Sequence, residues 1–188
     1  MPDERPLLVI VGGPPAAGKS TLAAQLAREL RLPLLARDTL KECLMDSLGS
    51  PSRARSRELG AASYAMLFLV LDLVLDAGVD AILESNFSRG RSEIELRDPV
   101  ARSRAVQLHC SVPRDLSRSR YIARAESGQR HPGHHDSATE TLADFDTSQA
   151  ERRHEPLDLD IPLLTVDTTD GYIPDLPAIL AFIQDVHA

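Results

Sequence analysis

The sequence contains no tryptophan, and aromatic residues make up only 4 % of its 188 residues. We therefore expect a core built mainly from leucine, valine, isoleucine and alanine. Cysteine is also scarce: Cys43 and Cys110 lie far apart and form no CxxC pair. This argues against a disulfide framework and against a cysteine-based zinc site, and it favours a reducing cytoplasm.

Lysine is equally rare, because the chain has two lysines beside nineteen arginines. The net charge of −7 is distributed unevenly: residues 89–130 carry ten arginines and five acids, so the remainder carries −12. An acidic body argues against unspecific binding of nucleic acid. A local cluster of arginines is what phosphate chemistry requires.

No segment has the features of a secretion signal or a membrane anchor. The acidic start of the chain leads directly into a strand-like segment, unlike a signal peptide. The longest apolar run, residues 61–83, contains Asp72, Asp76 and Asp80. An aspartate at the bilayer centre costs about 2.5–3.5 kcal/mol, so we expect a core helix followed by a strand and no membrane partner.

Short apolar, β-branched runs alternate with longer amphipathic segments along the whole chain. This order predicts an α/β fold in which helices cover both faces of a parallel sheet, as a single domain over residues 1–188. In such sheets, ligands bind at the carboxyl ends of the strands. The strands are expected at residues 7–11, 34–36, 81–84, 105–112 and 161–166. Helices are expected, among other places, at residues 53–76 and 137–153.

A complete P-loop pattern, Gly13-x4-Gly18-Lys19-Ser20, follows the first strand and opens a helix. Its backbone amides are expected to surround the phosphates of a nucleotide, with Lys19 at the β- and γ-phosphates. Ser20 would bind Mg²⁺, and Thr21 would contact the α-phosphate. A chance glycine-rich turn is the alternative, but strand, loop and helix occur in the required order. The predicted cofactor-binding loop is Gly13, Pro14, Pro15, Ala16, Ala17, Gly18, Lys19, Ser20 and Thr21.

Asp38 follows the second strand, where it would face the γ-phosphate. A carboxylate there can accept the proton of an attacking hydroxyl group, although aspartate also favours the N-cap of a helix. Arg37 and Lys41 flank it. They are candidates for binding an anionic part of the acceptor, or they are plain surface charges.

The third strand ends at Glu84, and Asn86 and Arg89 follow it. An acid at this position can hold Mg²⁺ through water. Asn86 and Arg89 are candidates for orienting the acceptor, but asparagine is also common in turns and arginine on surfaces.

An arginine-rich segment follows the fourth strand. Arg120 and Arg124 lie four residues apart and share one face of a predicted helix. A movable pair of arginines there would stabilise the charge of the transferred phosphate; a solvated basic face is the alternative. For Arg118 and Arg130, the sequence favours neither a role at the phosphate nor a solvated surface position. Arg130 is also a candidate for substrate binding.

The loop "HPGHHD" at residues 131–136 matches no standard zinc spacing. It is more typical of a lid or an acceptor-binding loop, and the lid is expected at about residues 114–136. After the fifth strand, Thr168 and Thr169 either contact the nucleobase or form a plain turn.

In this order and spacing, "GGPPAAGKST", "RDTLKE", "ILESNFS", "RYIARAESGQRH" and "VDTTDG" resemble the small P-loop kinases, in particular the group of zeta toxin, chloramphenicol phosphotransferase and gluconate kinase. The resemblance implies a sheet of order 2-3-1-4-5, ATP with Mg²⁺, and transfer of the γ-phosphoryl group to a hydroxyl group. It also implies that Asp38 is the base. Arg120 would stack on adenine, and Arg124 would contact phosphate.

Three functions are consistent with these features. The first is an ATP-dependent kinase of a small molecule such as a sugar, a nucleotide sugar, an antibiotic or another metabolite. The second is a polynucleotide 5′-hydroxyl kinase, which "RDTLKE" also resembles, although the acidic charge argues against an extended basic track. The third is a regulatory ATPase that has no acceptor. The sequence does not indicate an oligomeric state.

Overall fold

The computed structural model describes residues 4–128, 130–136 and 139–185. Its strands form one parallel sheet of order β2-β3-β1-β4-β5, as the sequence and the family resemblance predict. The central strand β1 pairs with β3 and β4, so its side chains are buried on both faces. The strands are β1 (Leu7–Gly12), β2 (Leu34–Ala36), β3 (Ala81–Glu84), β4 (Arg104–Ser111) and β5 (Leu163–Asp167).

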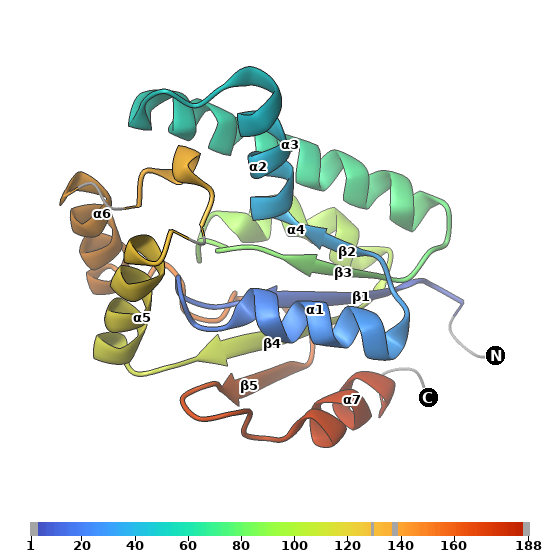
Figure 1. Ribbon diagram of the computed structural model, residues 1–188. Helices are drawn as coiled ribbons and strands as arrows, with labels where there is room; N and C mark the ends of the chain where they lie inside the picture. The colour runs from blue at the N-terminus through green and yellow to red at the C-terminus, as the bar shows by residue number, and fades with distance from the viewer. Residues whose placement is uncertain (1–3, 129, 137–138, 186–188) are drawn as a thin grey trace.

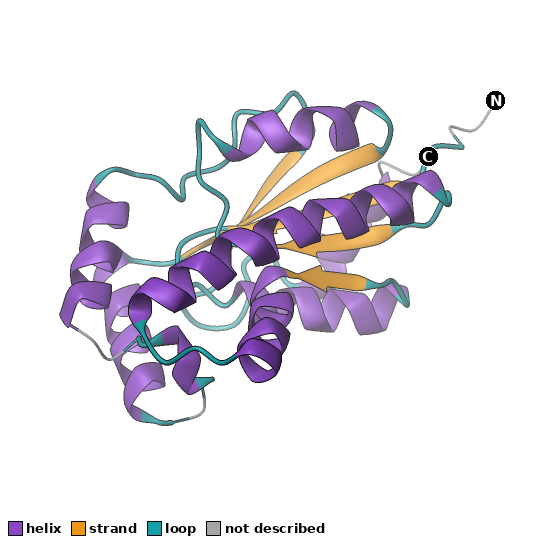
Figure 2. Ribbon diagram, turned by 90° about the horizontal axis from the view of Figure 1, so that it is seen from above, coloured by secondary structure: helices purple, strands orange, loops and turns teal. Residues whose placement is uncertain are grey.

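Helices cover both faces of the sheet, which gives three layers (Figures 1 and 2). Alternate residues of β1 point to opposite faces because successive side chains of a strand alternate. Val9 packs with α1 and α7, whereas Leu8 and Ile10 pack with α3 and α4. The helices are α1 (Lys19–Leu30), α2 (Arg37–Leu48), α3 (Arg53–Asp76), α4 (Ser92–Ala101), α5 (Arg114–Glu126), the short 3-10 helix η1 (Pro132–His134), α6 (Thr139–Ala150) and α7 (Leu176–Asp185).

Helix α3 occupies the apolar run that resembles a membrane span. It is the single candidate found among the described residues, and 39 % of its most apolar window is buried inside the protein. Leu67, Leu71 and Leu75 form its core-facing stripe. Its N-cap is Ser52, whose side chain accepts a hydrogen bond from the backbone N–H of Arg55.

Two segments differ from the expectation. Part of the predicted loop at residues 131–136 forms η1, because the His131 side chain caps it by accepting from the backbone N–H of Gly133. The predicted helix at residues 137–153 is α6, which ends at Ala150; residues 137 and 138 lie outside the described part of the chain.

The carboxyl ends of the strands face one end of the molecule, where α5, α6 and η1 are gathered (Figure 1). The start of α2 and the N-terminal half of α3 reach the same end. The fold therefore brings the residues that follow β1, β2, β3 and β5 together beneath these helices.

Candidate active site

The loop between β1 and α1 depends on two glycines. Gly13 has φ +133°, and a Cβ atom there would lie 2.3 Å from the backbone oxygen of Cys110. Gly18, the N-cap of α1, has φ +80°. A side chain at either position would strain the backbone, so these glycines are required for the loop to curl against β4 and to enter the helix.

Lys19 is the first residue of α1, and only 5 % of it is exposed. Its ammonium group donates a hydrogen bond to the backbone oxygen of Pro14 (2.7 Å), and burial lowers its pKa. The group lies in a cavity of about 190 Å³, which we call the loop cavity. The loop cavity is lined by Pro15, Ala16, Gly18, Lys19, Ser20, Thr21, Asp38, Glu84, Asn86, Arg120 and Arg124.

Ser20 and Glu84 face each other at the floor of the loop cavity. The Ser20 hydroxyl donates to Glu84 Oε2 at 3.3 Å. Burial raises the pKa of Glu84, and the nearby charge of Lys19 opposes that rise. No group of three or more His, Cys, Asp or Glu able to hold a metal occurs among the described residues. Mg²⁺, however, commonly takes one or two protein oxygens and completes its shell with phosphates and water, so this pair fits that ion.

Thr168 supports the loop from below. Its buried hydroxyl lies 2.8 Å from the backbone oxygen of Ala17 and 3.0 Å from that of Ser111. The Thr168 side chain therefore faces the loop, whereas Thr169 is exposed. The backbone oxygens of both threonines accept hydrogen bonds from Arg120, at 3.0 and 2.8 Å. This contact joins α5 to the turn after β5.

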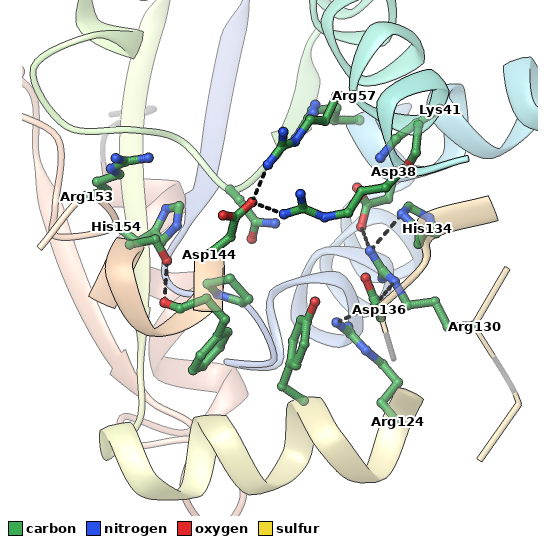
Figure 3. A pocket seen from close by; sticks show the side chains of 18 of the residues that line it. Asp38, Lys41, Arg57, Arg124, Arg130, His134, Asp136, Asp144, Arg153 and His154 are labelled. Atoms are coloured by element: carbon green, nitrogen blue, oxygen red, sulfur yellow. Dashed lines mark hydrogen bonds and ion pairs between the residues drawn. The ribbon is translucent and has the colours of Figure 1, made fainter. Parts of the chain in front are cut away.

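A second, larger cavity of about 590 Å³ is shown in Figure 3, and we call it the outer cavity. It shares Pro15, Asp38, Asn86 and Arg124 with the loop cavity. The Oδ1 atom of Asn86 is buried without a hydrogen-bond partner. The outer cavity is also lined by Arg37, Lys41, Arg53, Ser56, Arg57, Tyr121, Arg130, His134, Asp136, Asp144, Phe145, Thr147, Ser148, Arg153 and His154.

Asp38 stands where the two cavities meet. It lies in the first turn of α2, whose N-cap is Ala36, so the alternative of a capping role is not found. Arg130 donates to Asp38 Oδ2 at 3.1 Å. Burial opposes ionisation of Asp38, but Arg130 and the other nearby cations outweigh it and lower the pKa to about 2. Asp38 is therefore a carboxylate at neutral pH.

Two histidines of the segment around η1, His131 and His134, contact carboxylates of α2, whereas His135 contacts the backbone oxygen of Ser50; the three do not form a metal site among the described residues. His134 Nε2 lies 2.9 Å from Glu42 Oε1, and its Nδ1 lies 3.2 Å from Arg130 Nη2. Burial and the charge of Arg130 lower the pKa of His134 to about 3, so the ring is neutral. Nδ1 then accepts from Arg130 and Nε2–H donates to Glu42. His131 Nε2 lies 3.0 Å from Asp46 Oδ1.

The arginines of α5 point in two directions. Arg120 and Arg124 both line the loop cavity, and Arg124 also lies 3.8 Å from Asp136 at the outer cavity. Arg118 instead pairs with Asp146 of α6 at 3.1 Å. Arg89 lies outside both cavities: its backbone N–H donates to Arg153, and it lines a separate surface hollow with Arg152 and residues around it.

Several lining residues of the outer cavity were not anticipated. Asp144 of α6 pairs with Arg53 and Arg57 of α3, about 90 positions apart in the chain. Arg153 and His154 come from the segment after α6 (Figure 3). The four-residue spacing of Arg53 and Arg57 indicates that they share one helix face, but nothing in the sequence identifies Asp144 as their partner.

Residues 8–152 match the family described as AAA domain. A candidate kinase from Chloroflexus aurantiacus j-10-fl is 34 % identical, with a TM-score of 0.84 over 99 % of this chain and 100 % of that chain. A shikimate kinase from Pseudomonas savastanoi pv. phaseolicola is 35 % identical over 121 residues, which cover 59 % of this chain and 63 % of that kinase. A gluconokinase from Sinorhizobium meliloti 1021 shares the fold, with a TM-score of 0.57 at 15 % identity over 97 % of this chain and 94 % of that chain.

Proposed function

This chain belongs to the AAA domain family, and from that premise we propose that it is an ATP-dependent kinase that transfers the γ-phosphoryl group to a hydroxyl group of a small molecule. One observation carries the proposal. Pro15, Asp38, Asn86 and Arg124 line both the loop cavity and the outer cavity. A hydroxyl group in the outer cavity can therefore meet the end of a triphosphate bound in the loop cavity.

In the loop cavity, the backbone amides from Gly13 to Thr21 and the ammonium group of Lys19 would bind the phosphates. Lys19 would exchange its contact with Pro14 for phosphate oxygens. Ser20 and Glu84 would hold Mg²⁺, which neutralises charge between the β- and γ-phosphates. Arg120, fixed at the turn of Thr168 and Thr169, would lie against the nucleobase.

In the outer cavity, the acceptor hydroxyl would lie between Asp38 and Asn86. Its oxygen forms the bond to the γ-phosphorus while the bond from that phosphorus to the bridging oxygen of ADP breaks. The hydroxyl proton passes to the ionised carboxylate of Asp38. Arg124 would stabilise the charge on the transferred group. Asn86 Oδ1, which lacks a partner, is suited to accept a hydrogen bond from a second hydroxyl group.

We further propose that residues 114–136, which include α5 and η1, act as the lid of a single kinase domain spanning residues 1–188. Arg120 and Arg124 of α5 and Arg130 beside η1 all reach the cavities from this segment. Closure of such a segment excludes water from the transferred phosphate. A cytoplasmic location agrees with the two free cysteines, Cys43 and Cys110.

The test combines nucleotide binding with an unbiased search for an acceptor. Calorimetry with Mg·ATP should show binding. Incubation of the protein with Mg·ATP and a metabolite extract should give a compound that gains the mass of one phosphate while ADP forms. Slow hydrolysis of ATP that no hydroxyl compound accelerates would instead indicate a regulatory ATPase. A labelled 5′-hydroxyl oligonucleotide in a parallel reaction would detect a polynucleotide kinase.

A further inference from the structure

The cations of the outer cavity divide into two groups, those with an acidic partner and those without one. Arg53 and Arg57 share the carboxylate of Asp144, and Arg124 and Arg130 share that of Asp136. Arg153 pairs with Glu151. For these arginines, the protein itself provides the counter-charge.

Arg37 and Lys41 make no ion pair with any described residue. They lie one turn apart on α2, and both are half-buried. Arg37 donates to the backbone oxygen of Gly60 at 3.2 Å, while its Nε atom is buried without a partner. Burial of Lys41, reinforced by the charge of Arg37, lowers the lysine pKa to about 8. The carboxylates of Asp38 and Asp136 oppose this fall in the pKa of Lys41, but neither forms an ion pair with it. Two half-buried cations side by side are therefore stabilised when an anion lies between them.

Gly60 of α3 makes room for these two side chains. A Cβ atom there would lie 3.0 Å from Arg37 Nη2, 3.5 Å from Lys41 Cε and 3.7 Å from Lys41 Nζ. Gly60 is helical and has no positive φ, so its backbone does not require glycine. Glycine in a helix interior is less favourable than alanine. Glycine at this position therefore serves to leave space for the side chains of Arg37 and Lys41.

A further cavity of about 410 Å³ opens at these side chains, and we call it the basic side cavity. It shares Arg37, Lys41, Ser56, Arg57 and Asn86 with the outer cavity. Arg91 adds another cation, and no described acidic residue lines it. The lining is otherwise completed by Gly60, Ala61, Tyr64, Ser88 and Ser92.

We infer that the basic side cavity binds an acidic group of the acceptor, a carboxylate or a phosphate, between Arg37 and Lys41 above Gly60. The inference rests on the proposed kinase function, because it assigns a substrate class to the same site. It selects acidic hydroxy compounds from among sugars, nucleotide sugars, antibiotics and other metabolites. Gly60 is then a specificity-determining residue, because a side chain there would crowd the Arg37 guanidinium and fill the space beside Lys41.

The position of Asp38 limits the size of such an acceptor. Arg37, Asp38 and Lys41 lie within the first five residues of α2, and positions three or four apart on a helix have Cβ atoms about 5–6 Å apart. The phosphorylated hydroxyl, at Asp38, and the acidic group are therefore a few bonds apart in one compact molecule.

Lys41 provides a direct test, because Lys19 is the only other lysine in the chain. The protein is loaded with Mg²⁺ and a non-hydrolysable ATP analogue and treated with an amine-acylating reagent. The modification rate of Lys41 is read by mass spectrometry in the presence of glycerol, D-glycerate, glycerol 3-phosphate or inorganic phosphate. An anion present at several times its dissociation constant should slow the modification at least about fivefold. Protection by glycerate alone identifies a carboxylate site, and protection by the phosphates alone identifies a phosphate site.

Two variants show whether the protection comes from this cavity. Gly60→Ala should weaken it while leaving the melting temperature unchanged or raised, because the added methyl group crowds Arg37 and alanine favours the helix. Arg37→Gln should abolish it. Arg55→Gln is the matched control, since Arg55 pairs with Glu58 on α3 and lines none of the three cavities; it should keep full protection.

The inference is overturned if no anion protects Lys41, if glycerol protects it equally, or if protection persists in both Gly60→Ala and Arg37→Gln. Failure of the proposed function appears separately, as the absence of heat with Mg·ATP. In that case, the protection of Lys41 by inorganic phosphate can still be measured without nucleotide.

Discussion

The loop cavity and the outer cavity meet at Asp38, but they are built in different ways. Six of the eleven residues that line the loop cavity lie between Pro15 and Thr21, and α5, α2 and the end of β3 provide the others. The outer cavity draws its lining from α2, α3, α5, η1, α6 and the segment after α6. The first is made mainly by one short stretch of backbone, and the second by side chains from distant elements.

This difference indicates which part of the site tolerates substitution and which part does not. The loop cavity depends on main-chain amides and on glycines whose φ angles leave little choice of residue. The outer cavity depends on charged side chains, which can be exchanged without changing the backbone. The nucleotide site is therefore expected to be common to relatives, and the acceptor site particular to each of them. The predictions below test the two cavities against each other.

The largest effect is expected in the loop cavity. Lys19→Ala removes the ammonium group that would lie against the β- and γ-phosphates. We expect kcat/KM to fall by at least about 10³-fold, as for other single charges on a transferred phosphate. Steady-state ADP formation and calorimetry with Mg·ATP measure the loss. Turnover at the wild-type rate would contradict the assignment of the phosphate site.

At the junction of the cavities, Asp38→Asn should separate binding from transfer. The amide cannot accept the hydroxyl proton, so kcat should fall by about 10²–10⁴-fold. The dissociation constant for Mg·ATP should stay within about twofold, because backbone amides and Lys19, not Asp38, bind the phosphates. Asp185→Asn on α7 is the control and should keep full activity. Full transfer by Asp38→Asn would show that this carboxylate is not the base.

The Thr168 hydroxyl, which contacts the loop between β1 and α1, should contribute to stability and not to the chemical step. Thr168→Val keeps the shape of the side chain but leaves the buried backbone oxygen of Ala17 without the hydroxyl donor, whereas the oxygen of Ser111 keeps the backbone N–H of Thr168. We expect the free energy of unfolding to fall by about 1–3 kcal/mol, with weaker binding of Mg·ATP. Thermal or urea unfolding measures the change. Thr165→Val is the control, because Thr165 is exposed on β5, three residues before Thr168, and an equal loss there would contradict the role of Thr168.

The smallest effect is a pH dependence at the outer cavity. His134 contacts Arg130 and Glu42, with Asp38, Lys41 and His131 also near it. Its folded-state pKa of about 3 lies below the ordinary 6.5, so the unfolded chain binds the proton more readily. Its contribution to stability is fully present above pH 6.5 and is lost as the pH falls toward 3. Between pH 7 and pH 5, this one residue accounts for up to about 2 kcal/mol.

His134→Gln should flatten this dependence in melting curves recorded from pH 7 to pH 5. A residual slope is expected from His109, whose burial lowers its pKa to about 4. An unchanged slope in His134→Gln would show that His134 is not held neutral in the folded protein.

The contrast between the cavities also explains what the sequence could predict. The P-loop is contiguous, so its motif, its strand and its helix were predicted together. The sheet order came from the family resemblance and is confirmed. Helix α3 was predicted with its exact bounds because its apolar run is long and ends at clear turn signals.

The wall of the outer cavity could not be predicted in the same way. The contact of Asp144 with Arg53 joins positions 91 apart, and no local pattern encodes such a pair. Arg89 follows β3 as a substrate-binding residue would, but its backbone is bonded to Arg153 and it lies at a separate hollow. Thr168 occupies the expected loop, and the direction of its side chain depends on packing against Ala17. Side-chain direction at loop positions requires the tertiary structure.

The bond from Thr168 to Ala17 spans 151 positions of the chain, and this separation has a consequence for biosynthesis. Translation produces the loop between β1 and α1 long before Thr168, which follows β5 and holds that loop in place. A nascent chain that ends ahead of β5 would display the entire glycine-lysine signature without the hydroxyl that fixes its shape. Such a fragment should capture nucleotide poorly, so competence to bind should arise late in synthesis, once β5 has joined the edge of the sheet.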